Sequence, residues 1–134
     1  MFTRRALFAA AIAMTALPAF AQNIERPWVS TDDVQALLDA GDTVFVDFKA
    51  TWCGTCKVQE RQIDAILTED PSLMDQIKFV NVDWDEYGED DFTKSLNIPR
   101  RSTLVLFDGR TEIGRLVAIT DRDQIFDLID MGLE

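Results

Sequence analysis

Short apolar stretches alternate along the chain with stretches of helical period, which is the pattern of a mixed α/β fold. Residues 43–48 and 78–83 are mostly apolar and β-rich, as expected of strands buried in a central sheet. Residues 103–107 and 111–117 read as two further strands, and Asp108-Gly109 between them is typical of a hairpin turn. A brief edge strand within residues 22–29 would make a fifth.

The segments between these strands carry apolar residues at helical spacing. The polar cluster from Ser30 to Asp33 predicts the start of a helix that ends at Gly41. Further helices are expected over residues 54–67, 73–77 and 90–96, and after Asp121. The order α-β-α-β-α-β-β-α implies one α/β domain, with a mixed four- to five-stranded sheet and helices on both faces.

The first 21 residues have the composition of an export signal. Arg4 and Arg5 precede an apolar core over residues 7–17 and a cleavage site with small residues at positions 19 and 21, and the apolar run is too short to span a bilayer comfortably. We expect a cleaved signal peptide over residues 1–21, a domain over residues 22–134, a periplasmic location and no stable membrane insertion. A retained N-terminal anchor is the alternative, and the arginine pair leaves the twin-arginine export route open.

The charge and the composition of the chain argue against several kinds of partner and of metal site. The formal net charge is −11, and loss of the two signal arginines would take it to −13, which argues against nucleic acid or an anionic membrane surface. The chain has no histidine, which removes histidine-based catalysis and most transition-metal sites. The acidic run at residues 83–91 fails the EF-hand pattern because Tyr87 and Lys94 occupy ligand positions. We predict no cofactor and no metal.

The two cysteines, Cys53 and Cys56, lie at the junction between the strand over residues 43–48 and the helix that follows. A sulfur at a helix N-terminus lies near unpaired backbone N–H groups, which favour a thiolate. A second sulfur one turn later can close a small disulfide ring and release whatever is bound to the first. We therefore interpret Cys53 as the attacking thiolate and Cys56 as the more buried resolving thiol, with an inert disulfide as the alternative.

The motif Trp-Cys-Gly-Thr-Cys-Lys at residues 52–57 resembles that of the thioredoxin superfamily, and the resemblance extends over nearly all of residues 28–134. It implies a thioredoxin fold and a monomeric thiol–disulfide oxidoreductase that acts on protein disulfides. Asp47 matches the buried acid of the family, so we expect it to be the base for Cys56, although a solvated strand-end position is the alternative. By the same resemblance, Trp52, Arg101, Ser102 and Thr103 are candidate substrate-binding residues.

The sequence departs from the family at three positions. The family has a cis-proline immediately before the residue that matches Thr103, where this chain has Ser102; the alternative is a slipped loop in which Pro99 takes that place. A cis bond at Ser102 would be costly, so we expect a trans bond and a less fixed loop. Val117 stands where a groove glycine is usual, and Lys49 replaces a common aromatic residue. Arg100 and Arg101 are expected to face Cys53, either stabilising its thiolate and steering an acidic partner or forming a solvated loop.

The residues between the cysteines include no histidine, so a strongly stabilised thiolate has no obvious source. We therefore expect a reductant that is recharged by a membrane-bound electron donor. Two other functions remain open: a metal or iron–sulfur protein in which two chains share a cluster, and a binding module that does not use the cysteines.

Overall fold

The computed structural model describes residues 24–134, and the predicted signal peptide lies outside this part of the chain. Its centre is a four-stranded sheet in the order β2-β1-β3-β4. The strands are β1 (Thr43–Lys49), β2 (Lys78–Asp83), β3 (Thr103–Asp108) and β4 (Thr111–Val117). β1 runs parallel to β2 and antiparallel to β3, and β3 and β4 form an antiparallel hairpin. The predicted mixed sheet is confirmed.

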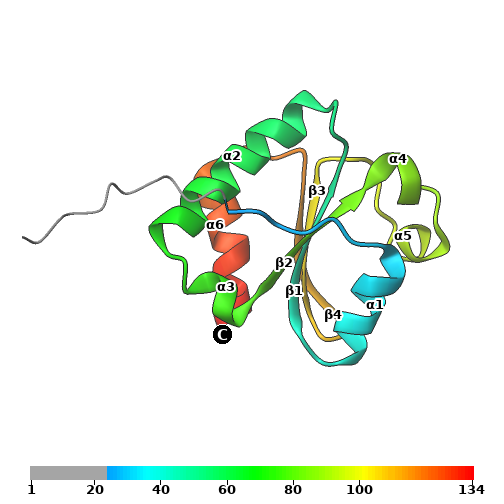
Figure 1. Ribbon diagram of the computed structural model, residues 1–134, viewed down its shortest axis with the longest axis horizontal. Coiled ribbons are helices and arrows are strands. Elements are labelled where there is room, and N and C mark those ends of the chain that lie inside the picture. Colours follow the sequence, from blue (N-terminus) through cyan, green and yellow to red (C-terminus); the bar gives the residue numbers. More distant parts are fainter. Residues whose placement is uncertain (1–23) are drawn as a thin grey trace, which may run out of the picture.

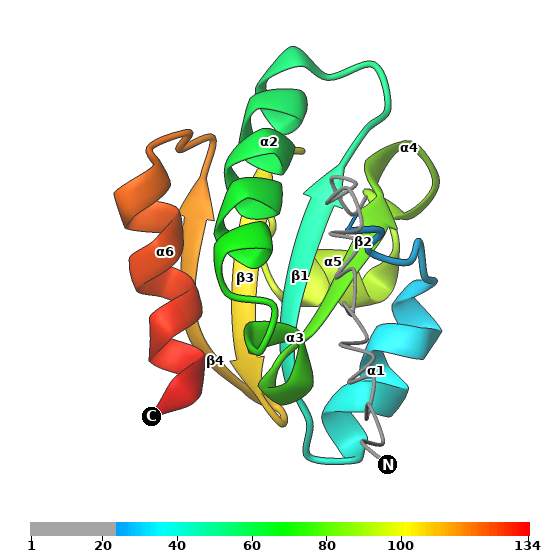
Figure 2. The ribbon, with the colours of Figure 1, turned by 60° about the vertical axis from the view of Figure 1, so that its left-hand side comes forward.

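Helices cover both faces of the sheet (Figure 1). One face carries α2 (Gly54–Glu69), α3 (Leu73–Gln76) and α6 (Arg122–Asp130), which continues into a 3₁₀ turn at Met131–Leu133. The other face carries α1 (Thr31–Asp39), α4 (Trp84–Tyr87) and α5 (Asp91–Ser95). Figure 2 shows α2 lying along the sheet, with its N-terminus near the end of β1. Among residues 24–134, no helix has the length and apolar character needed to cross a membrane.

Alternation along β1 divides the hydrophobic core into two layers. Phe45 faces α2 and packs in a cluster with Ile63 and Ile66, whereas Val46 and Phe48 belong to the cluster on the other face. Successive side chains of a strand point to opposite faces of the sheet, so Asp47 and Lys49 fall on the same face as Phe45. Two charged residues of β1 therefore lie under α2.

The ends of the main helices confirm the capping residues expected from the sequence. Ser30 begins α1 with a capping box, in which its hydroxyl accepts from the Asp33 N–H at 3.1 Å and its own N–H donates to the Asp33 carboxylate at 3.1 Å. Asp121 caps α6 through the Gln124 N–H. Gly109 has φ +54° in the two-residue turn between β3 and β4, a conformation that favours glycine.

The lead-in segment pairs with the outer edge of β2. Trp28 forms an isolated parallel bridge with Asn81, whose N–H donates to the Pro27 carbonyl at 2.8 Å and whose carbonyl accepts from the Val29 N–H at 2.9 Å. The brief edge strand foreseen in this region is thus a single bridge. The helix α4, which was not predicted, forms at the start of the acidic run at residues 83–91. The Asp83 side chain caps α4 through the Asp85 N–H at 3.0 Å.

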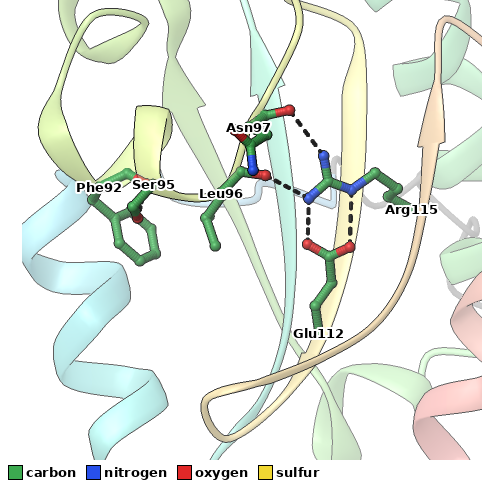
Figure 3. A network of polar contacts seen from close by, with 6 residues as sticks. All are labelled: Phe92, Ser95, Leu96, Asn97, Glu112 and Arg115. Carbon is green, nitrogen blue, oxygen red and sulfur yellow. Dashed lines mark hydrogen bonds and ion pairs between the residues drawn. The ribbon is translucent and has the colours of Figure 1, made fainter.

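The segment that follows α5 is fastened to β4 by one arginine (Figure 3). The Arg115 guanidinium donates to the carbonyls of Leu96 at 2.8 Å and Asn97 at 3.2 Å, and it pairs with the Glu112 carboxylate. Asn97 has φ +53°, where the chain turns away from α5. These contacts fix the entry to the loop that leads to Ser102.

Candidate active site

Cys53 and Cys56 meet at the N-terminus of α2, where the helix geometry places both sulfurs beside backbone donors. Cys53 is the N-cap residue, with extended backbone angles, and its Sγ accepts a hydrogen bond from the Cys56 N–H at 3.2 Å. Both cysteines are free thiols and are almost fully buried, at 2% and 1% exposure. Cys56 was expected to be the more buried of the two, but the exposed fractions of the two side chains differ very little.

The two thiols nevertheless differ in acidity. Burial by itself raises the pKa of Cys53, but hydrogen bonds from Cys56 and Ser102, with a smaller contribution from Arg101, outweigh it and lower the pKa to about 7. Burial and the neighbouring Cys53 raise the pKa of Cys56 above its usual value. At neutral pH, Cys53 is thus poised as a thiolate and Cys56 as a thiol.

Ser102 lies across from the cysteines, at the position where the family has its cis-proline. Its Oγ is 3.2 Å from the Cys53 Sγ and 3.1 Å from the Cys56 Sγ. The peptide bonds of residues 24–134 are all trans, as expected for a serine here, and Ser102 has φ +63°.

The backbone of Ser102 is held from three directions, so the expectation of a less fixed loop is wrong. Its N–H donates to the Phe48 carbonyl at 2.8 Å, and its carbonyl accepts from the Ala118 N–H at 2.8 Å. The Gln59 side-chain amide donates to the same carbonyl and to that of Ile119, both at 3.0 Å. Sequence reasoning missed Gln59, a fully buried polar residue of α2 at i+3 from Cys56.

Asp47 is fully buried beneath α2, and neither of its carboxylate oxygens has a hydrogen-bond partner within residues 24–134. Burial raises its pKa from the usual 3.8 to about 6, against the opposing influence of Lys49 and Arg26. The buried position excludes the alternative in which Asp47 points into solvent. Its action as a base for Cys56 stays a prediction.

A group of charged residues surrounds this carboxylate. Lys49, only 5% exposed, pairs with Glu60 at 3.4 Å and lies 5.0 Å from the centroid of the Trp28 ring. Arg26, 6% exposed, pairs with Asp64 at 3.2 Å. The replacement of an aromatic residue by Lys49 thus brings a buried cation under α2. Sequence analysis did not identify Arg26, because nothing in its local pattern distinguishes it from a solvated arginine.

The same residues line a cleft that reaches the active-site pair. The cleft has a volume of about 820 Å³, and its lining includes Arg26, Trp28, Lys49, Glu60 and Cys56. It lies on the side of Cys56 formed by the lead-in segment and α2. Cys56 therefore borders a cleft lined by both polar and apolar side chains as well as the apolar core.

The surface beside Cys53 carries an aromatic residue held from two sides. Trp52 is 56% exposed, the Arg101 guanidinium lies over its ring, and its Nε1–H donates to the Asp85 carboxylate at 2.7 Å. Trp84, rather than Trp52, packs against the buried cluster of the two cysteines.

The other predicted residues of the loop before β3 make hydrogen bonds within the loop itself. Thr103 is fully buried and its hydroxyl donates to the Arg100 carbonyl at 2.6 Å, while the Arg100 Nε–H donates to the Arg101 carbonyl at 3.1 Å. Of the predicted substrate-binding side chains, Trp52 and Arg101 are accessible, whereas Ser102 and Thr103 are buried. Within residues 24–134, no three acidic or cysteine side chains are grouped to hold a metal ion.

Comparison with known proteins places this arrangement in one family. The family model described as Thioredoxin matches residues 28–131. The thioredoxin of Chlamydia caviae is 31% identical over 102 residues, which cover 76% of this chain and 93% of that protein. Thioredoxin H2-1 of Oryza sativa subsp. japonica is 33% identical over 82 residues, which cover 61% of this chain and 54% of that protein.

Solved structures agree in fold. The crystal structure of Malassezia sympodialis thioredoxin superposes with a TM-score of 0.69 at 24% identity, covering 83% of this chain and 96% of that one. The family match, the thioredoxin fold and the asymmetric cysteine pair lead to one conclusion. This chain belongs to the thioredoxin family of thiol–disulfide oxidoreductases.

Proposed function

We propose that this protein reduces disulfide bonds of protein substrates outside the cytoplasm. The observation that carries the proposal is the difference between the two sulfurs: the pKa of Cys53 is lowered to about 7, whereas that of Cys56 is raised. Disulfide exchange in two steps needs one sulfur that is ready to attack and one that waits. Cys53 fits the attacking role and Cys56 the waiting one.

In the first step the Cys53 thiolate attacks one sulfur of the substrate disulfide. The Cys53–substrate bond forms, the substrate S–S bond breaks, and the other substrate sulfur leaves as a thiolate. Cys56 then loses its proton and attacks the Cys53 sulfur, which forms the Cys53–Cys56 disulfide and expels the second substrate thiolate. Two electrons pass from the cysteine pair to the substrate, whose two thiolates take up protons.

The direction of the reaction follows from how strongly the thiolate is stabilised. Oxidants of this kind have a very acidic cysteine, with a pKa of about 3.5, and its stabilised thiolate favours their reduced form, whereas a pKa of about 7 accompanies a reductant. The Cys53 pKa of about 7 supports the reductant role.

The exported location is supported by the arginine pair, apolar core and small residues of the first 21 positions. Each turnover leaves a Cys53–Cys56 disulfide, so a reductant outside the cytoplasm needs a source of electrons. We assign that role to a membrane-bound donor. Trp52 and Arg101 are the surface we propose to meet the protein substrate.

A redox titration of the protein against defined thiol–disulfide buffers, read by tryptophan fluorescence, tests the direction. We expect a reduction potential of about −270 mV for the Cys53–Cys56 pair. A value of about −120 to −180 mV would instead show an oxidant or isomerase.

The substrate class is tested by expressing the full chain with Cys56→Ser, which keeps the attacking sulfur and removes the resolving one. Mixed disulfides with exported proteins are expected on non-reducing gels. A Cys53→Ser, Cys56→Ser double variant is the control and forms none. Absence of mixed disulfides from the single variant, or capture of cytoplasmic proteins alone, would contradict the proposal.

A further inference from the structure

The Ser102 hydroxyl is within hydrogen-bonding distance of both reacting sulfurs. Its Oγ is 3.2 Å from the Cys53 Sγ and 3.1 Å from the Cys56 Sγ, and all three atoms are buried. A serine hydroxyl has one proton to donate and two lone pairs that accept. It can therefore donate to only one of the sulfurs at a time.

The position of this hydroxyl is imposed by its surroundings. Ser102 has φ +63°, a conformation that residues other than glycine adopt uncommonly. Backbone hydrogen bonds to Phe48 and from Ala118 hold it there, and the Gln59 amide adds a third contact. Buried residues in uncommon backbone conformations persist where the surroundings fix them, and they gather at functional sites. Three contacts thus hold the Ser102 backbone where its hydroxyl lies against both sulfurs.

We propose that Ser102 is a catalytic residue whose hydroxyl serves the two sulfurs in turn. In the reduced protein it donates to the Cys53 thiolate. Once Cys53 has attacked the substrate, its sulfur is part of a neutral mixed disulfide and no longer draws the hydroxyl proton. The hydroxyl then rotates and donates to the Cys56 thiolate as that thiolate forms.

This switch stabilises whichever sulfur is the nucleophile at each step. During attack by Cys53 it favours the charged form of the attacking sulfur, and during resolution it favours the charged form of Cys56. The proton lost by Cys56 and the one lost earlier by Cys53 end on the two substrate thiolates, so the overall reaction is unchanged. Donation to Cys56 is needed because this cysteine is buried, and burial opposes the ionisation of its thiol. The inference rests on the proposed disulfide exchange.

Two variants remove the hydroxyl in different ways. Ser102→Gly deletes it and accepts φ +63° without strain, whereas Ser102→Ala deletes it and keeps a side chain. Thr31→Val is the matched control, because it removes a buried hydroxyl that bonds to the Asp90 carboxylate rather than to a sulfur. Circular dichroism and thermal unfolding establish that each variant is folded.

Two readouts follow: the pH dependence of Cys53 alkylation, and the lifetime of the mixed disulfide with a small aromatic disulfide in rapid-quench experiments. Both Ser102 variants are expected to move the alkylation midpoint to higher pH and to lengthen the lifetime about 10- to 100-fold, the loss expected for one hydrogen bond to a charged sulfur. Thr31→Val is expected to change the lifetime less than about twofold.

The outcomes separate this inference from the function on which it rests. If the native protein forms no mixed disulfide, both the exchange function and the role of Ser102 are wrong. If the native protein exchanges and both Ser102 variants match it in midpoint and lifetime, only the role of Ser102 is wrong. An effect seen with Ser102→Ala but not with Ser102→Gly would assign the result to backbone strain and would also overturn the hydroxyl's role.

Discussion

Arg101 covers the indole ring of Trp52, with its guanidinium carbon 4.4 Å from the ring centroid. The contact joins the loop before β3 to the segment before α2, so the two sides of the active site meet above Cys53. A cation over an aromatic face is attracted by the ring quadrupole. The exposed tryptophan and the positive charge of Arg101 therefore hold each other in place beside Cys53.

Arg101→Met should raise the pKa of Cys53, because Arg101 is one of the groups that lower it. The pH dependence of iodoacetamide alkylation measures the change as a midpoint at higher pH. Arg100→Met is the control, since Arg100 donates to the Arg101 carbonyl and is not among the groups that shift Cys53. Identical midpoints for the native protein and Arg101→Met would contradict the assignment.

Alkylation of the native protein should distinguish the two cysteines. Cys53 is expected to react with a midpoint near pH 7, while Cys56 stays unmodified until higher pH, because burial and the neighbouring sulfur oppose its ionisation. Peptide mapping by mass spectrometry counts the label on each sulfur. Cys56→Ala should move the Cys53 midpoint to higher pH, since it removes the side chain whose hydrogen bond contributes most to the lowering. Equal labelling of both cysteines at pH 7 would show that the division of roles is wrong.

Asp47→Asn should stabilise the fold at neutral pH but not in acid. The folded protein raises the Asp47 pKa from 3.8 to about 6, so the charged form is disfavoured by folding. Below about pH 4 the carboxyl is protonated in both states and no penalty exists. As the pH rises through 6 the native protein loses about 3 kcal/mol relative to the variant.

Urea unfolding of the native protein and Asp47→Asn from pH 3.5 to 8 measures this difference. Comparing the two proteins at each pH removes the contribution of the other titrating groups. A constant difference across this range would mean that Asp47 does not titrate with a raised pKa in the folded state.

Lys49→Met should raise the pKa of Asp47 further, because Lys49 is the largest influence that opposes burial there. Titration of the Asp47 carboxyl by NMR measures the value directly in each protein. Lys78→Met serves as the control, since Lys78 is exposed at the start of β2 and pairs with Asp42. A titration midpoint unchanged from that of the native protein would show that Lys49 does not act on Asp47.

Arg115→Leu should destabilise the protein by about 1 to 2 kcal/mol, because it leaves two carbonyls and one carboxylate without their charged donor. Amide hydrogen exchange should quicken most near Asn97. Arg110→Leu breaks an exposed ion pair with Asp39 and should cost less than about 0.5 kcal/mol. Equal losses in the two variants would mean that Arg115 does not hold the loop.

Most of the fold could be read from the sequence, because its strands have strong local signals. The β-rich apolar runs, the capping residues Ser30 and Asp121 and the Asp-Gly turn each specify structure over a few residues. The short helix α4 was missed because it has only four residues, two of them acids, which is too few to establish a helical period. Its start depends on the cap by Asp83, a single contact that a helical pattern does not reveal.

The spacing of Cys53 and Cys56 identified the cysteine pair, and only the family resemblance pointed to Asp47 and Ser102. Arg26 and Trp84 reach the site through packing between distant segments, and Gln59, although close to Cys56 in the chain, takes part through its contact with Ser102. The fixed Ser102 loop was missed for the same reason. Its backbone partners, Phe48 and Ala118, come from β1 and from the end of β4, and only the folded sheet brings them together.

The pairing of residues 27–29 with β2 has a consequence for self-association. An uncovered strand edge is a template on which another chain can add a strand. Here the backbone of Pro27 and Val29 occupies both the N–H and the carbonyl of Asn81. A chain cut after Val29 would lose these two hydrogen bonds, and the backbone of Asn81 would then be open to pairing with a strand of a second molecule. The position of an N-terminal cut therefore affects whether the β2 edge is covered.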